Sequence, residues 1–227
     1  QGTVLPILVI SWVLATIEKF FHKKLKGTAD FLITPMLTLL ITGFLTFIVI
    51  GPIMRSLGTA LGHGLQTVYE AGGPIGGFLF GLVYSPIVIT GLHQSFPPIE
   101  LQLQQQGGSF IFATASMANI AQGAATLAVF LLAKGEKLKG LAGAFGVSAV
   151  LGITEPAIFG VNLRLRWPFF IGIGSAAVGG ALIALLNVKA VALGAAGFLG
   201  VVSIKAEDMG PFMICAVITF IVSFAAA

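Results

Sequence analysis

The sequence predicts an all-helical integral membrane protein that crosses the bilayer several times. Of its 227 residues, 57% are hydrophobic and only 9% are charged, whereas a soluble domain carries roughly a quarter charged residues. Several apolar runs approach the length of about 20 residues that a helix needs to cross the hydrocarbon core. Because lipid offers no hydrogen-bond partners, the backbone of each run must pair with itself, which favours helices.

Two apolar runs open the chain, and each is predicted to be one spanning helix. The first covers residues 4–21 and ends at a cluster of lysines, and the second covers residues 31–54. Hydroxyl residues recur every four positions in the second run and therefore line one helix face. Close packing against a neighbouring helix explains this stripe better than a polar pathway does. The stripe consists of Thr34, Thr38, Thr42 and Thr46.

Residues 55–72 form a mixed stretch in which apolar residues recur about four positions apart, from Leu57 to Val68. This spacing predicts an amphipathic helix that lies along the membrane interface. We assign His63 in this stretch, and His22 earlier in the chain, to solvent. The polar residues of the stretch are Arg55, His63, Gln66 and Glu70.

The next apolar run, residues 74–96, is not expected to be a straight span, because Pro86 interrupts its backbone hydrogen bonds and polar residues precede its end. If this run and the following one, 109–133, both crossed the membrane, the lysines after residue 133 would lie outside, against the positive-inside rule. One re-entrant segment restores the parity. The candidates are two stretches rich in glycine or proline, near 86–108 and 141–163.

Further spans are predicted over residues 167–186, 188–204 and 211–227. The helix predicted over 109–133 has one polar side, because its small and polar residues recur three or four positions apart. These residues are Ser116, Asn119, Gly123 and Thr126, with Gln122 beside them.

The positive charge of the chain indicates topology rather than nucleic-acid binding. The formal net charge is +4, and the basic residues cluster beside apolar runs, as cytoplasmic flanks do. A single cysteine, Cys215, can form neither an intrachain disulfide nor a multi-cysteine metal site, and we expect no metal and no cofactor. The chain opens at Gln1 without an initiator methionine or a charged leader, so we expect an internal fragment without a signal peptide. The clusters are Lys19, Lys23, Lys24 and Lys26, and Lys134, Lys137 and Lys139.

Glu155 is the most informative residue, since a carboxylate at bilayer depth costs about 2.5–3.5 kcal/mol unless partners or water compensate it. Pro156 is expected to push Glu155 out of the helical conformation and leave backbone groups free for a polar ligand. The alternative is a carboxylate at a helix end in the interface. His93 taken alone is as compatible with interfacial packing, but together with Glu155 it can accept a proton from a hydroxyl group. Arg164 and Arg166 follow this stretch and fit charge neutralisation, phosphate contact or topology.

Residues 152–163, GITEPAIFGVNL, resemble the signature of enzyme IIC, the membrane subunit of the glucose superfamily of phosphotransferase permeases. The segment GLHQSF (91–96) resembles the second motif of that family. The segments TVLP (3–6) and IEKF (17–20) resemble the usual start of a middle helix. Residues 93–100 and 116–123 look closest to trehalose permeases, then to sucrose and beta-glucoside permeases.

The resemblance implies a homodimeric, multi-pass protein of the bacterial inner membrane that carries a disaccharide by an elevator-like movement. Residues 1–72 then supply scaffold helices and the interfacial helix, and residues 73–227 the transport part with two re-entrant hairpins. We expect the first membrane helices of the family to lie outside this chain, which would leave the enzyme IIC fold incomplete. The implied catalytic residues are Glu155 and His93, and the implied sugar contacts also include Gln94, Thr154, Asn119 and Asn162.

In such systems a phosphocysteine on a cytoplasmic IIB domain phosphorylates the sugar as it arrives. This chain contains no such domain, so we expect it to bind and translocate only. Two other functions remain compatible with the residues. One is a transporter driven by protons or sodium, with Glu155 as the ion site. The other is a membrane scaffold without transport activity.

Overall fold

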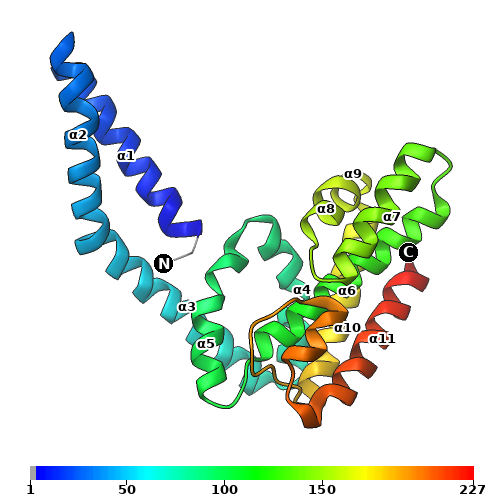
Figure 1. The fold of residues 1–227 in the computed structure, drawn as a ribbon. Coiled ribbons are helices and arrows are strands. Elements are labelled where there is room, and N and C mark those ends of the chain that lie inside the picture. The colour runs from blue at the N-terminus through cyan, green and yellow to red at the C-terminus, as the bar shows by residue number, and fades with distance from the viewer. Residues whose placement is uncertain (1–3) are drawn as a thin grey trace. The chain divides into compact units, whose positions relative to one another are not determined.

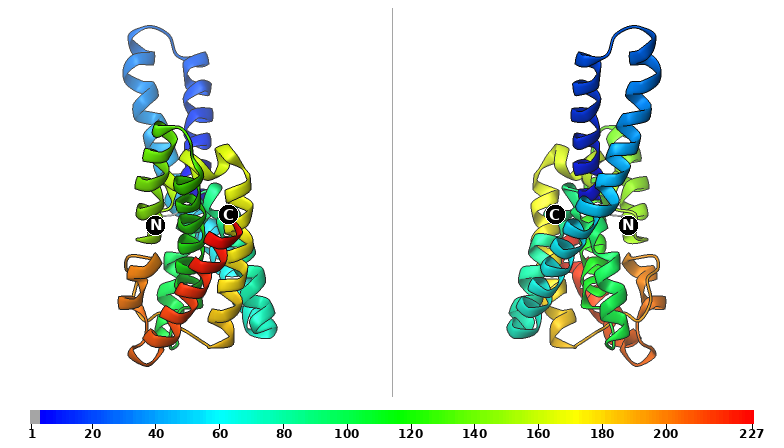
Figure 2. Two further views of the ribbon diagram at one scale, coloured as in Figure 1. Left: turned by 90° about the vertical axis from the view of Figure 1, so that its right-hand side faces the viewer. Right: turned by 90° about the vertical axis from the view of Figure 1, so that its left-hand side faces the viewer.

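The computed structural model describes residues 4–227, except for the side chains of residues 4–6, 55, 58, 59, 61–63, 65 and 70. The chain forms two compact units, Gln1–His63 and Gly64–Ala227, and each is described by itself (Figures 1 and 2). The described residues form helices and connecting turns without a β-strand, which confirms the predicted fold class. The motif residue Thr3 and the side chains of Arg55, His63 and Glu70 lie outside the described part.

The first unit is built around a helical hairpin. Helices α1 (Val4–Lys24) and α2 (Thr28–Leu45) lie side by side and are joined by a turn at Gly27, whose φ of 61° suits a residue without a Cβ. Helix α2 continues through a π-helical turn (Thr46–Ile50) into α3 (Gly51–Gly72). The hydroxyl stripe is the buried face of α2, which confirms that it serves close packing. Its buried members are Thr34, Thr38 and Thr42.

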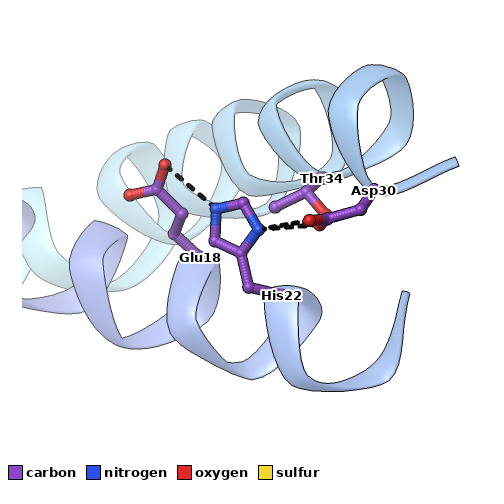
Figure 3. Close-up of polar contacts among 4 residues, drawn as sticks. All are labelled: Glu18, His22, Asp30 and Thr34. Carbon is purple, nitrogen blue, oxygen red and sulfur yellow. Dashed lines mark hydrogen bonds and ion pairs between the residues drawn. The ribbon is translucent and has the colours of Figure 1, made fainter. Parts of the chain in front are cut away.

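A polar cluster joins α1 to α2 beside this turn (Figure 3). The His22 Nδ1 atom lies 2.7 and 2.8 Å from the two Asp30 carboxylate oxygens, and His22 Nε2 lies 3.9 Å from Glu18 Oε1. Thr34 donates a hydrogen bond of 2.6 Å to Asp30. His22 is therefore exposed, as expected, but bonded rather than merely solvated. Because its side chain is 50% exposed, water and salt screen these contacts, and they add little to stability.

Helix α6 (Phe110–Leu132) forms the centre of the second unit. Helices α7 (Glu136–Val150), α10 (Trp167–Leu185) and α11 (Met209–Ala226) pack against it, and α4 (Pro74–Ile89) packs mainly against α10. Every residue from Phe110 to Thr126 is buried. The side chain of Ser109 caps α6 by accepting a hydrogen bond of 3.2 Å from the Ile111 amide.

Two stretches of the second unit break the long helices. The first contains a 3₁₀ turn (Leu92–Ser95) and α5 (Pro97–Gln105). The second contains α8 (Glu155–Ala157), a π-helical turn (Ile158–Asn162) and α9 (Leu163–Leu165). Pro86 does not break its helix, because α4 continues to Ile89; a proline is tolerated in an apolar helix that neighbouring elements hold in place.

The prediction of a spanning helix over residues 188–204 is wrong. This segment is irregular, with short bridges from Ala190 to Ser109 and to Ile204, followed by 3₁₀ turns (Gly197–Ser203 and Ala206–Asp208). Gly197 has a φ of 67°, and a Cβ there would lie 2.3 Å from the carbonyl oxygen of Val150. The 3₁₀ turn Gly197–Ser203 packs against α6, α7 and α11, and part of the segment is buried, including Val188, Ala190 and Ile204.

Four helices of the described part are long and apolar enough to cross a membrane. This finding agrees with a multi-pass membrane protein and with most of the apolar runs in the sequence. The four segments are Thr28–Met54, Phe110–Leu132, Trp167–Leu185 and Ala206–Ala226.

Candidate functional site

His93 is positioned by the break that follows α4. That helix ends at Ile89, and Gly91 adopts the left-handed conformation with a φ of 74°, which glycine takes up readily. The chain then makes the 3₁₀ turn that carries His93 and Gln94. Pro97 starts α5 in the first turn, where its missing N–H costs no helical hydrogen bond. The side chains of His93 and Gln94 therefore lie on the short turn that joins α4 to α5.

Glu155 is positioned by the break that follows α7. After this helix Gly152 has a φ of 108°, and a Cβ there would lie 2.7 Å from the carbonyl oxygen of Ala196. Only glycine fits both the conformation and the close approach. Helix α8 begins at Glu155, with Pro156 in its first turn. Glu155 is thus helical, contrary to the prediction from Pro156, because the first turn of a helix accepts proline.

The two breaks bring His93 and Glu155 together, although the residues are far apart in the sequence. His93 Nε2 lies 4.0 Å from Glu155 Oε1, and Gln94 Nε2 lies 3.1 Å from the same imidazole nitrogen. The side chain of His93 is 17% exposed and that of Glu155 is 50% exposed. A recessed imidazole beside an exposed amide and a half-exposed carboxylate offers both donors and acceptors to a ligand rich in hydroxyl groups.

The other predicted site residues lie deeper than this trio. Thr154 and Asn119 are 5% and 8% exposed, and Asn162 is fully buried. Asn119 Nδ2 donates a hydrogen bond of 3.3 Å to the carbonyl oxygen of Gly152, so it supports the backbone just before Glu155. The structure therefore gathers His93, Gln94 and Glu155, and it places Asn119 and Asn162 where they hold the chain around Glu155.

Sequence reasoning missed the role of Gln122. Its fully buried side chain donates hydrogen bonds to Ser85 Oγ at 3.2 Å and to the Phe169 carbonyl at 3.3 Å, and it accepts one of 2.8 Å from Asn162 Nδ2. The polar side of the predicted helix signalled that Gln122 would have partners. The sequence could not show which elements supply them.

Burial and charge act in opposite directions on the pKa of His93, whose turn lies outside the four candidate spans. Burial lowers this pKa, and the charge of Glu155 and the Val88 carbonyl raise it by less. The lowered pKa of His93 favours the neutral imidazole, which has one ring N–H and one lone pair. A neutral imidazole can hydrogen-bond a hydroxyl group and still accept its proton.

Glu100, in α5, is a buried carboxyl that the sequence did not single out. It is 6% exposed, and its Oε2 atom has no hydrogen-bond partner among the described residues. Burial raises the pKa of Glu100 to about 7 from its ordinary value of 4.5. Tyr84 lies within electrostatic reach of both Glu100 and Glu155, so Glu100 belongs to the surroundings of the site.

The raised pKa of Glu100 predicts a pH-dependent stability. Above its unfolded-state pKa the unfolded chain loses a proton that the folded protein retains, so the free energy of unfolding falls as pH rises from about 4.5 to about 7. The loss amounts to about 3 kcal/mol, and Glu100→Gln should remove it. The measurement is the unfolding midpoint of the detergent-solubilised protein across this pH range. Glu207→Gln, which changes a 78% exposed carboxylate, is the matched control; parallel curves for Glu100→Gln and the parent would contradict the prediction.

No group of three or more His, Cys, Asp or Glu side chains in the described part of the chain could hold a metal ion. Cys215 is a buried, free thiol in α11.

Comparison with known proteins identifies the family. Residues 1–177 match the family described as Phosphotransferase system, EIIC. The chain is 55% identical to the sucrose-specific EIIBC component of Staphylococcus xylosus, with 92% of this chain and 45% of that protein covered. It is 53% identical to the sucrose-specific EIIBCA component of Pediococcus pentosaceus (99% and 35% covered). It is 45% identical to the trehalose-specific EIIBC component of Bacillus subtilis (99% and 48% covered).

The helical fold and the apolar spans define a polytopic membrane protein. The chain belongs to the phosphotransferase system EIIC family, which confirms the resemblance seen in its motifs. It spans less than half the length of the three relatives named above. No solved structure matches the chain significantly.

Proposed function

We propose that this chain is the sugar-conducting part of a phosphotransferase permease for a disaccharide, with sucrose the favoured substrate. The contact between His93 and Glu155, 4.0 Å apart, supports the proposal most directly, because it joins the two family motifs in one place. The motifs favour trehalose, but this preference is not supported. The relatives of 53–55% identity are named sucrose-specific, and the trehalose-specific one is 45% identical.

The geometry suggests a division of roles at the site. Glu155, with its half-exposed carboxylate, accepts hydrogen bonds from sugar hydroxyls, and charged acceptors make the stronger bonds. His93 and Gln94 contact further hydroxyls from the opposite side. Thr154 and Asn119 complete the surroundings through the backbone next to Glu155. Asn162 does not contact the sugar, because it is fully buried; it acts only through other residues of the protein.

Phosphorylation involves a partner, the cytoplasmic IIB domain. A sugar hydroxyl oxygen attacks the phosphorus of a phosphocysteine; the new O–P bond forms, the S–P bond breaks, and the hydroxyl proton passes to Glu155 or His93. Orienting the hydroxyl in line with the S–P bond is the main contribution of the site.

In the same proposal the protein is a homodimer in the bacterial inner membrane, with residues 1–72 as scaffold and 73–227 as the moving part.

The test is the unfolding midpoint of the purified protein in detergent with sucrose, trehalose, maltose or a beta-glucoside. A ligand at about a hundred times its Kd stabilises the folded state by about 2.7 kcal/mol, and sucrose is expected to give the largest shift at equal concentration. A protein that no disaccharide stabilises contradicts the proposal. Uptake in vesicles that follows a proton or sodium gradient, without a phosphoryl donor, would instead indicate a secondary transporter.

A further inference from the structure

Gln122 connects more elements of the second unit than its position on one helix suggests. Its side chain is fully buried, and its amide nitrogen bonds to Ser85 of α4 and to the Phe169 carbonyl of α10. Its amide oxygen accepts from Asn162 Nδ2 in the π-helical turn that follows Glu155. One side chain thus links three neighbouring elements to α6.

The Asn162 side chain forms this hydrogen bond with the Gln122 amide oxygen and two others. Its Nδ2 atom also donates a hydrogen bond of 3.1 Å to the Gln122 carbonyl, and its Oδ1 atom accepts one of 2.8 Å from Thr126 Oγ1. Both polar atoms of the amide are therefore engaged within the protein. Asn162 has no exposed surface, so its bonding holds the chain in place and leaves little for a ligand.

Side chains on one face of α6 therefore form hydrogen bonds with the chain on both sides of Glu155, at Gly152 and at Asn162. Asn119 holds the carbonyl of Gly152 at 3.3 Å, and Gln122 and Thr126 hold Asn162. These α6 residues lie three and four positions apart, which places them on one helix face. Glu155 lies between the two fixed points, so its backbone position is set by α6.

The backbone of α10 makes room for the Gln122 amide. A Cβ at Gly172 would lie 2.6 Å from both Cδ and Nε2 of Gln122, closer than side-chain atoms approach. A buried polar network of this kind fixes one arrangement when all its members are satisfied, and a partly satisfied one is costly. Gly172 thus gives the Gln122 amide the room that this network needs beside α10.

From these contacts we infer that Gln122 is a positioning residue, which sets Glu155 against His93 through its bond to Asn162. The inference rests on the proposed function and deepens it. Gln122 does not touch the sugar; it determines where the sugar-binding carboxylate lies. This role predicts weaker sugar binding when Gln122 is replaced. The effect should be seen only in a protein that still has the Glu155 carboxylate, because Gln122 acts through the position of that group.

The test is a double-mutant cycle between Gln122→Met and Glu155→Gln, with the Kd for labelled sucrose measured by equilibrium dialysis in detergent. Methionine nearly keeps the volume of glutamine and removes its three side-chain hydrogen bonds. We expect Gln122→Met to raise Kd about tenfold in the parent and less than about twofold in the Glu155→Gln background, since coupled residues are not additive. Ser116→Ala is the matched control on α6, because Ser116 Oγ donates its hydrogen bond to the carbonyl of Phe112 in its own helix, and the Kd of this variant should not change.

Equal losses in both backgrounds would show that Gln122 supports the fold alone, and an unchanged Kd in the parent background would also overturn the inference. If Gln122→Met does not fold, Thr126→Val is the milder variant, since it removes only the hydroxyl that binds Asn162 Oδ1. It should raise Kd severalfold with the same dependence on Glu155. A parent protein that binds no disaccharide would overturn the proposed function itself, and the positioning role with it; the parent measurement separates this outcome from the others.

Discussion

Replacing Glu155 by glutamine is expected to weaken sucrose binding about a hundredfold. A hydrogen bond to a charged acceptor contributes about 1.5–3 kcal/mol, and a loss of about 2.7 kcal/mol corresponds to about a hundredfold in Kd. Glutamine keeps the shape of the side chain but loses the charge, and it presents an N–H group where the carboxylate accepts. Because this side chain is 50% exposed, the fold should be unaffected. The measurement is the Kd for sucrose by titration calorimetry in detergent.

The matched control for this change is Glu207→Gln, which neutralises a carboxylate that is 78% exposed and lies 4.0 Å from Lys205 Nζ. It alters the net charge by the same amount and should leave the Kd unchanged. His93→Gln is expected to weaken binding by about tenfold, since it removes one neutral hydrogen-bonding group. If Glu155→Gln binds sucrose as tightly as the parent does, Glu155 does not hold the sugar.

The sequence predicted the helical spans because their apolar runs are long enough to cross the hydrocarbon core. The same logic failed over residues 188–204, an apolar segment that folds into short bridges and 3₁₀ turns instead of a helix. Hydropathy cannot distinguish such a segment from a spanning helix. The bend at Gly197 depends on the carbonyl of Val150, a partner that is distant in the sequence.

The resemblance of two motifs to one family predicted that His93 and Glu155 belong to one site. The structure brings the two residues together. The burial of the neighbouring residues Asn119 and Asn162 was not predicted. Asn119 and Asn162 are amides that suit sugar binding by type, yet their partners are Gly152, Gln122 and Thr126. Residue type indicates what a side chain can bond; only tertiary packing decides whether a ligand or the protein supplies the partner.

The close approach of α4 to α10 predicts a second large effect, on stability. Glycines four positions apart in α4 allow backbone contact: a Cβ at Gly77 would lie 2.3 Å from the Gly180 carbonyl oxygen, and one at Gly81 would lie 2.3 Å from that of Ala176. Gly77→Ala or Gly81→Ala must separate the helices, since backbone atoms cannot move aside as a flexible side chain can. Overpacking of this kind costs about 3 kcal/mol, seen as a lower unfolding midpoint in detergent.

Gly174→Ala, in the same α10 helix, should have the opposite effect. Outside its own helix backbone, no heavy atom of the described residues lies within 4 Å of its added Cβ, and alanine stabilises a helix interior relative to glycine by about 0.5–1 kcal/mol. Because α4 leads into the turn that carries His93, and α10 bonds to Gln122, separating these helices should also loosen the site. Gly81→Ala is therefore expected to weaken sucrose binding as well as stability, whereas Gly174→Ala leaves binding unchanged. Equal unfolding midpoints for Gly81→Ala and Gly174→Ala would mean that the two backbones are not in contact.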